Sequence, residues 1–272
     1  MSDFLKKMAT HSAERAADAP RHYRDDELDA PVFGMRLQGF DIIAELKDSS
    51  PSEGAIAASG HDRLEQVAHY ARGGAAAVSV LTEPTTFGGS VDHLRDTAAA
   101  LAPLGIPAMR KDFLVDSVQV LEARAAGASG VLLIAAMLDD MQLAAMLDCA
   151  YEQKMFVLLE SFDEDDLKRS IRLLEDPLHR DAARAGQLLF GINSRNLRTL
   201  AVDTGRLDRL SALLPPKVAC VAESGLETAD DAARAASLGY RLALVGTALM
   251  RHDDPQALLR DMLDAGRARC AA

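Results

Sequence analysis

Short runs of apolar residues recur along the chain from Asp41 onward, and longer charged segments separate them. The runs cover residues 41–46, 75–81, 107–110, 130–135, 155–160, 188–193, 218–222 and 242–246. They are rich in Val, Ile and Leu and are apolar on both faces, which is typical of strands buried in a parallel sheet. The pattern therefore predicts eight buried β-strands.

The charged, alanine-rich segments between the runs have the spacing of amphipathic helices. We expect helices at residues 61–73, 92–102, 117–126, 139–152, 163–174 and 229–238. A short helix is expected at residues 247–251, and the sequence Asp-Asp-Pro at 253–255 predicts the start of a last helix. Residues 175–187 are interpreted as a surface loop with a short helix.

Strands that alternate with helices run parallel and are joined by right-handed crossovers. Eight such units predict an α/β fold that closes into a (β/α)8 TIM barrel. A doubly wound open sheet is the alternative, and it usually has a glycine-rich phosphate turn after its first strand. Residues 45–54 read ELKDSSPSEG and contain no Gly-x-Gly-x-x-Gly, so the barrel is favoured.

The chain length of 272 residues fits a single barrel, since such barrels commonly have about 250 residues. No linker or low-complexity segment divides the sequence. We therefore predict one barrel over residues 1–272, with residues 1–40 as an N-terminal helical extension that packs on it. Within this extension, residues 3–17 are expected to form an amphipathic helix.

The composition excludes several classes of function. The net charge of −11 argues against a nucleic-acid-binding protein, which would need a basic surface. No stretch approaches about 18 apolar residues, so we expect neither a membrane span nor membrane binding. Cys149, Cys220 and Cys270 form no CxxC pair and lie near no histidine at ligand spacing, which favours a cytoplasmic protein without a structural zinc.

Charged and amide side chains gather at the C-terminal ends of the predicted strands, where barrels of this kind have their active sites. These residues are Glu45, Lys47, Lys111, Glu160, Asn193, Arg195 and Glu223. Glu45 and Lys47 are two residues apart on one strand, so their side chains point to the same side. Because buried charges are costly unless they are paired or used, this gathering favours a catalytic site over separate structural ion pairs.

Small residues follow the last two predicted strands, as Ser224-Gly225 and Gly246-Thr247. In barrels, the loops at these positions often bind a phosphate through backbone N–H groups and the N-terminus of a short helix. The short helix expected at residues 247–251 fits this arrangement. We therefore predict a phosphate site at these two strand ends.

Six sequence blocks in a fixed order resemble the signature of a known family. They are IAELK at 43–47 with SPSEG at 50–54, VLTE at 80–83, FGGS at 87–90, RKDF at 110–113, GINSRNL at 191–197 and ESG at 223–225. In this order the blocks are similar to those of indole-3-glycerol-phosphate synthase. The chain is accordingly identified as a member of that family.

The resemblance implies a carboxy-lyase of tryptophan biosynthesis. The family converts 1-(2-carboxyphenylamino)-1-deoxyribulose 5-phosphate to indole-3-glycerol phosphate, CO2 and water. It needs no metal and no organic cofactor for this reaction. The expected partner is thus a small phosphorylated substrate, and we expect a monomer or a weak homo-oligomer.

The same resemblance implies the catalytic roles. The implied catalytic residues are Lys111, Glu160, Lys47, Glu45, Asn193 and Glu223. Lys111 would be the general acid for ring closure, with Glu160 orienting it and taking part in proton transfer. Lys47 with Glu45 would serve the later acid–base steps. A lysine acid can work near neutral pH if burial and neighbouring cations lower its pKa, and we expect this of Lys111.

The implied substrate contacts form a second set. They are Arg195, Ser50, Ser224, Gly225, Gly246, Thr247, Phe87 and Phe113. Lys47 and Arg195 would contact the carboxylate or the phosphate, and the small residues would form the phosphate site. Asn193 and Glu223 would hold the sugar hydroxyls and the lysine network, while the two phenylalanines would pack against the aromatic ring.

Three residues depart from the family pattern. Asp48 and Glu53 stand in the loop after the first strand, at positions where the family has basic residues. Their charges indicate either surface variation, with Asp48 paired to a local arginine, or an altered site for the anionic substrate. Phe162 also replaces a polar residue that often follows the Glu160 block.

Two other functions remain open at this point. One is a specialised paralogue that acts on a related amino-deoxyketose phosphate, and the other is a non-catalytic barrel. The intact set of strand-end residues argues against the second. A related isomerase of the same pathway would have a catalytic Cys and an Asp where this chain has Lys47 and Asn193, so that function is excluded.

Overall fold

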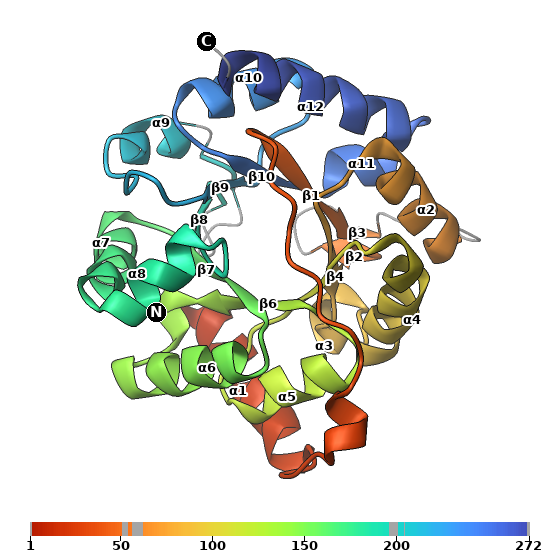
Figure 1. The fold of residues 1–272 in the computed structure, drawn as a ribbon, viewed down its shortest axis with the longest axis vertical. Coiled ribbons are helices and arrows are strands. Elements are labelled where there is room, and N and C mark those ends of the chain that lie inside the picture. The colour runs from red at the N-terminus through yellow and green to blue at the C-terminus, as the bar shows by residue number, and fades with distance from the viewer. Residues whose placement is uncertain (1, 51–53, 56–61, 196–200, 204, 271–272) are drawn as a thin grey trace.

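A closed barrel of parallel strands forms the centre of the molecule (Figure 1). The computed structural model describes residues 2–50, 54–55, 62–195, 201–203 and 205–270. The barrel strands are β1 Asp41–Leu46, β4 Ala77–Leu81, β5 Ala108–Lys111, β6 Gly130–Ile134, β7 Phe156–Ser161, β8 Leu188–Asn193, β9 Cys220–Glu223 and β10 Leu242–Val245. Their order around the barrel is β1-β10-β9-β8-β7-β6-β5-β4, and every neighbouring pair is parallel. The predicted TIM barrel is therefore confirmed.

The helices surround the barrel and cover the outer face of the sheet (Figure 1). They are α1 Asp3–Asp18, α2 Arg63–Gly73, α3 Pro84–Phe87, α4 Val91–Leu101, α5 Val118–Ala125, α6 Asp140–Glu152, α7 Glu164–Arg172, α8 Pro177–Arg184, α9 Arg206–Ser211, α10 Ala229–Ser237, α11 Thr247–Arg251 and α12 Pro255–Cys270. Single 3-10 turns lie at Asp25–Leu28, Ala102–Leu104, Ala135–Met137 and Leu173–Glu175. This outer layer explains why the strands are apolar on both faces: each strand has the barrel interior on one side and helices on the other.

The predicted helices match the observed ones closely, including the short helix α11. One start differs, because the helix expected from residue 61 begins at Arg63. There Asp62 is the N-cap, and its carboxylate accepts hydrogen bonds from the backbone N–H groups of Leu64 and Glu65. Three small elements were not predicted: helix α3, helix α9 and a two-stranded hairpin of β2 Ser49–Ser50 with β3 Gly54–Ala55.

The N-terminal helix α1 packs its apolar face into the same core as the barrel. Leu5 and Met8 are buried and join the main hydrophobic cluster. Ser12, one turn further along, is also buried, and its hydroxyl accepts a hydrogen bond from Gln119 Nε2 of α5 at 2.9 Å. This attachment places the C-terminal part of α1 beside the end of β5, where Lys111 lies.

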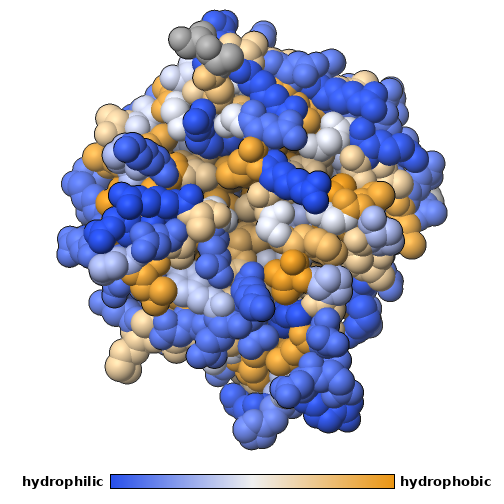
Figure 2. All heavy atoms as spheres, viewed as in Figure 1, coloured by the Kyte–Doolittle hydropathy of each residue, from blue (hydrophilic) through white to orange (hydrophobic). Residues whose placement is uncertain are grey.

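The face shown in Figure 2 is mainly hydrophilic, and its hydrophobic residues appear in small separate groups. Within the described part of the chain, no helix is long and apolar enough to cross a membrane.

Candidate active site

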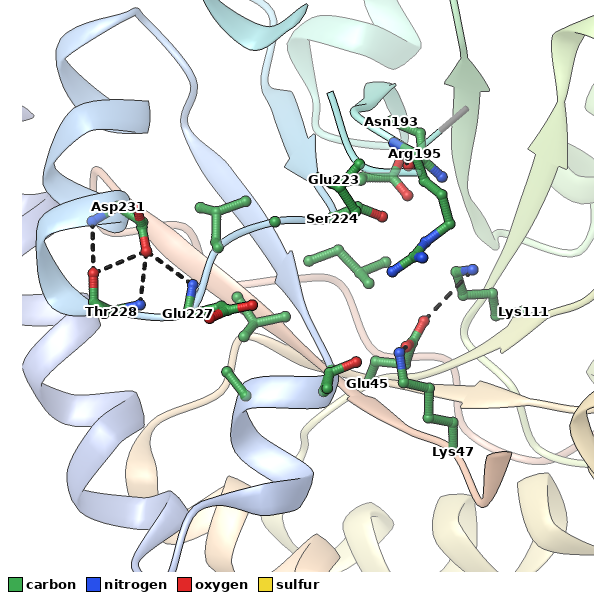
Figure 3. A pocket seen from close by; sticks show the side chains of 18 residues that line it. Glu45, Lys47, Lys111, Asn193, Arg195, Glu223, Ser224, Glu227, Thr228 and Asp231 are labelled. Atoms are coloured by element: carbon green, nitrogen blue, oxygen red, sulfur yellow. Dashed lines mark hydrogen bonds and ion pairs between the residues drawn. The ribbon is translucent and has the colours of Figure 1, made fainter. Parts of the chain in front are cut away.

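A cavity of about 380 Å³ opens at the C-terminal ends of the barrel strands. Ten of the predicted site residues line it: Glu45, Lys47, Lys111, Asn193, Arg195, Glu223, Ser224, Gly225, Gly246 and Thr247. In Figure 3 the charged side chains of β1, β5, β8 and β9 converge on this space. The strand ends thus gather residues that are up to about 200 positions apart in sequence, as the barrel geometry requires.

Glu45 is the central acceptor of the site. Its Oε1 lies 2.8 Å from Lys47 Nζ, and its Oε2 lies 3.5 Å from Lys111 Nζ (Figure 3). Burial of the carboxyl opposes its ionisation, but the two ammonium groups outweigh this and lower the pKa of Glu45 to about 2. Glu45 is therefore an anion at any physiological pH, and it fixes both lysines at the floor of the cavity.

The environment of Lys111 differs from the prediction. Burial alone would lower the pKa of its ammonium group, as expected from the sequence. Glu45, Glu160 and Glu223 face the same group, however, and together they raise its pKa above the ordinary lysine value. The expected lowering was wrong because these three carboxylates, and not other cations, dominate the surroundings. Before substrate binds, Lys111 therefore carries its proton at neutral pH.

Glu160 and Glu223 form a buried pair of acidic groups on β7 and β9. Both side chains are almost completely inaccessible to solvent. Burial and the nearby Glu160 carboxyl raise the pKa of Glu223 well above its ordinary value. Glu223 lines the cavity, whereas Glu160 lies beneath the surface of its lining. The geometry thus brings the predicted catalytic residues together. Five of them line the cavity, and Glu160 is buried behind the lining.

Asn193 organises the loop that follows β8. Its side-chain Oδ1 accepts a hydrogen bond from the backbone N–H of Arg195 at 2.8 Å. The backbone carbonyl of Asn193 accepts another from Arg206 Nη1 at 3.0 Å, a residue that the sequence did not single out. In Figure 3 the Arg195 side chain extends into the cavity toward Lys111. These contacts add a third cation to the two lysines of the site.

The residues predicted for the phosphate at the ends of β9 and β10 also line the cavity. Ser224 and Gly225 follow β9 with φ angles of 65° and 78°, the left-handed region that is unusual for serine. Gly246 precedes α11, and a Cβ at this position would overlap Oε1 of Glu45. A glycine at 246 therefore makes room for the carboxylate that holds the lysines, a role that the sequence did not predict.

The predicted aromatic contacts lie outside the cavity lining. The rings of Phe87 and Phe113 are neighbours, with centroids 5.9 Å apart. Phe4 of α1 packs edge-on against Phe113 at 5.7 Å. Ser50 belongs to the hairpin strand β2. Phe87 and Phe113, like Glu160, are not among the residues that line the cavity.

Asp48 is neutralised by its neighbours. Its Oδ2 lies 2.7 Å from Arg63 Nη2 of α2 and 3.9 Å from His93 Nδ1 of α4. The interpretation that Asp48 pairs with a local arginine is therefore confirmed. Glu53, the other reversed charge, lies outside the described residues. Phe162 packs into the hydrophobic core at the end of β7 and does not reach the cavity.

A buried ionic network supports Lys111 from behind. Asp112, the next residue, is buried and accepts hydrogen bonds from Arg15 Nη2 of α1 at 2.7 Å and from Thr82 Oγ1 at 2.8 Å. Arg110, the preceding residue, is also buried and donates to Thr82 Oγ1 and to Asp112 Oδ2. Adjacent residues on a strand point to opposite faces, so this network holds the strand whose other face presents Lys111.

Sequence reasoning missed this network and in particular Arg15. The only signal available was its position on the buried face of the helix with Met8 and Ser12. Glu83, at the end of β4, also turns out to be a helix cap: its carboxylate accepts hydrogen bonds from the backbone N–H groups of residues 85–87. Among the described residues, no group of three His, Cys, Asp or Glu side chains could hold a metal ion.

Comparison with known proteins gives a consistent family. The family model for indole-3-glycerol phosphate synthase matches residues 10–262. A protein of that name from Nocardioides sp. is 44% identical over 232 residues, covering 85% of this chain and 83% of its own. Indole-3-glycerol phosphate synthase from Leptothrix cholodnii is 38% identical over 273 residues, covering 95% of this chain and 98% of its own.

Solved structures support the fold alone. The 3-hexulose-6-phosphate synthase of Salmonella typhimurium superposes with a TM-score of 0.61 at 16% identity, covering 85% of this chain and all of its own. Orotidine 5'-phosphate decarboxylase of Pyrococcus horikoshii gives a TM-score of 0.55 at 14% identity, covering 83% of this chain and 99% of its own. With the match of the family model over most of the sequence, this chain belongs to the indole-3-glycerol phosphate synthase family.

Proposed function

We propose that this chain is an indole-3-glycerol-phosphate synthase, which closes the indole ring of 1-(2-carboxyphenylamino)-1-deoxyribulose 5-phosphate with loss of CO2 and water. The observation that carries the proposal is the pair of lysines held by one carboxylate inside a strand-end cavity, with Lys47 and Lys111 on either side of Glu45. The reaction needs protonated acids and cations at one place, and this arrangement supplies both.

The proposed ring closure uses Lys111 as the acid. Its protonated amine donates to the ketone oxygen of the substrate while the ring carbon attacks the ketone carbon. The carboxylates that keep Lys111 charged also make it a reluctant donor, since a general acid is most effective when its pKa is near the working pH. We infer that the positive charges of Lys47 and Arg195, which line the same cavity, offset part of the negative charge around Lys111.

The later steps follow from the same groups. Lys47 and Arg195 hold the substrate carboxylate out of the ring plane, so that CO2 leaves as the ring becomes aromatic again. Lys47 then protonates the departing hydroxyl in the dehydration. Glu45, with a pKa of about 2, is a weak base and serves mainly to hold the two lysines. The ring proton passes to the acidic pair, through Glu223 at the lining to Glu160 behind it, and Asn193 and Glu223 hold the sugar hydroxyls.

The binding roles are proposed from position. Ser224, Gly225, Gly246 and Thr247 lie together on one side of the cavity and would offer backbone N–H and hydroxyl groups to the phosphate. Ser50, Phe87 and Phe113 would contact the substrate, as the family resemblance implies. A cytoplasmic location and a monomeric or weakly associated state also remain predictions, which cell fractionation and sedimentation would test.

The direct test is turnover of the synthetic carboxyphenylamino substrate, followed by indole-3-glycerol phosphate fluorescence and by release of CO2. We expect both products in equal amounts. Absence of product above the uncatalysed background would refute the proposal. Turnover restricted to a related amino-deoxyketose phosphate would refute it equally, and would support a specialised paralogue in its place.

A further inference from the structure

Glycine at position 191 creates the space in which the two acidic groups of β7 and β9 meet. Gly191 lies on β8, between these strands, and is the register partner of Glu160. A Cβ at 191 would overlap Oε1 of Glu223. The Glu223 carboxyl therefore occupies the space that a side chain at 191 would fill. Any larger residue at 191 would move this carboxyl and so change its distance from Glu160.

Buried oxygens of this pair lack hydrogen-bond donors. Oε1 and Oε2 of Glu223 and Oε2 of Glu160 are inaccessible to solvent, and no donor within the described part of the chain reaches them. Glu160 is the register partner of Gly191 and the Glu223 carboxyl lies over the same glycine, so the two acids approach each other. Two carboxylates cannot form a hydrogen bond with each other, because neither has a proton to donate. One proton between them both removes the repulsion and supplies the missing donor.

We propose that Glu160 and Glu223 hold a single proton between them at neutral pH, and that Gly191 is the positioning residue that allows them to share it. The bond runs from the Glu223 hydroxyl to a carboxylate oxygen of Glu160. The pair then carries one negative charge instead of two. Glu223 lines the cavity, so this charge state is felt directly by a bound substrate.

The shared proton sets the charge of the site. With every group ionised, Glu45, Glu160 and Glu223 would equal Lys47, Lys111 and Arg195 in number, and Glu227 and Asp231 add two further carboxylates to the lining. One proton on the acidic pair removes one of these negative charges and so favours a substrate that carries both a carboxylate and a phosphate. This change in the charge of the site is important for binding an anion, because the whole chain has a net charge of −11.

The proton itself can be tested without any assumption about activity. Infrared spectra of the whole protein between about pH 5 and pH 10 should contain a carboxylic-acid C=O band that persists at pH 7 and disappears at higher pH. Glu223→Gln and Glu160→Gln should each abolish the band, and Gly191→Ala should shift its midpoint or remove it. Glu164→Gln, on the exposed face of α7, is the matched control and should leave it unchanged. Absence of any protonated carboxyl at pH 7 in the wild type would overturn the proposal.

The effect on substrate binding rests on the proposed function. A unit charge acting across roughly 10 Å at an effective dielectric of about 20 changes affinity on the order of tenfold. KM for the carboxyphenylamino substrate should therefore rise on the order of tenfold as the infrared band disappears, with the same midpoint. Measurements above about pH 7.5 avoid the ionisation of the substrate phosphate. In Glu223→Gln, KM should stay flat over this range.

The two claims fail separately. If the band is present but the wild type makes no indole-3-glycerol phosphate, the proposed function is wrong and the shared proton stands. If the band titrates and KM does not follow it, the charge-setting role is overturned. A band that survives in both glutamine variants would show that the proton belongs to another residue, and this would overturn the assignment to the pair.

Discussion

Arg15 is expected to hold the N-terminal helix against the strand that carries Lys111, and replacing it should cost a measurable part of the stability. Its Nη2 donates to Asp112 Oδ1 at 2.7 Å, and Asp112 is buried. In Arg15→Met the apolar stem of the side chain is kept and the charged hydrogen bond is lost. Asp112 still accepts hydrogen bonds from Arg110, Thr82 and the backbone N–H of Phe113, so its buried carboxylate keeps a positive partner and three donors. The loss should thus be that of one charge-assisted hydrogen bond and of the longer ion pair with the buried Glu83 at 3.7 Å, at least about 1.5–3 kcal/mol.

Asp112→Asn should cost more. It removes the carboxylate that faces both Arg15 and the buried Arg110, and breaking a buried ion pair from one side costs about 3–5 kcal/mol. Because the two residues act on each other, the double variant should lose clearly less than the sum of the single losses. Lys111 adjoins Asp112 on the strand, so kcat is also expected to fall in Asp112→Asn.

Urea unfolding at equilibrium measures these losses, and calorimetry should show Tm lower by roughly 2–4 °C for each kcal/mol lost. Arg21→Met is the matched control: Arg21 follows α1 and faces Asp116 at 3.5 Å, but both side chains are well exposed. It should change stability by less than about 0.5–1 kcal/mol. If Arg15→Met behaves like Arg21→Met, or if the double variant is additive, the reasoning about this network is refuted.

Three further predictions concern other parts of the molecule. Asp48→Arg should lower Tm, because it sets a cation against Arg63, while kcat/KM should change less than about threefold. The double variant with Arg63→Asp should restore Tm. A large loss of kcat/KM in Asp48→Arg would indicate that Asp48 acts on the substrate. Gly266→Ala should destabilise the fold by about 1–3 kcal/mol in urea unfolding, because its Cβ would overlap the ring of Phe40, and an unchanged stability would contradict this close packing. Glu45 has its pKa lowered to about 2 in the folded protein, so the stability it contributes is present above about pH 4.5 and is lost as the pH falls toward 2. In Glu45→Gln the free energy of unfolding should lack this acid-dependent part, which is on the order of 3 kcal/mol. An identical dependence of the unfolding free energy on pH in both proteins would refute the lowered pKa.

Strands and catalytic positions were predictable for the same physical reason. A strand that is buried on both faces has a distinct apolar run, so the residue that follows the run is placed at the barrel mouth. Glu45, Lys47 and Lys111 were located in this way, and the structure brings them together. For Asp48 the sequence left two interpretations open, and the structure shows the pairing with a nearby arginine, Arg63.

Contacts between distant segments were not predictable. Arg15 meets Asp112 across 97 residues, and nothing in the local pattern of either segment indicates the other. The predicted direction of the Lys111 pKa shift was wrong because the shift depends on the carboxyls of Glu45, Glu160 and Glu223, which lie on three other strands. A glycine inside the apolar run of β8 was a visible signal of close approach, but only the structure identifies Glu223 as the group above Gly191.

The central claim is that the Lys111 ammonium group is the acid that drives ring closure, and its replacement tests this most directly. Lys111→Met should reduce kcat for indole-3-glycerol phosphate formation by about 10²–10⁴-fold, the usual contribution of a general acid. Calorimetric titration with the unreacted substrate should still show binding within about tenfold of the wild-type KM. Lys168→Met, which removes an exposed lysine on α7, should leave both quantities unchanged. If Lys111→Met keeps kcat within tenfold of the wild type, the account of this site is contradicted.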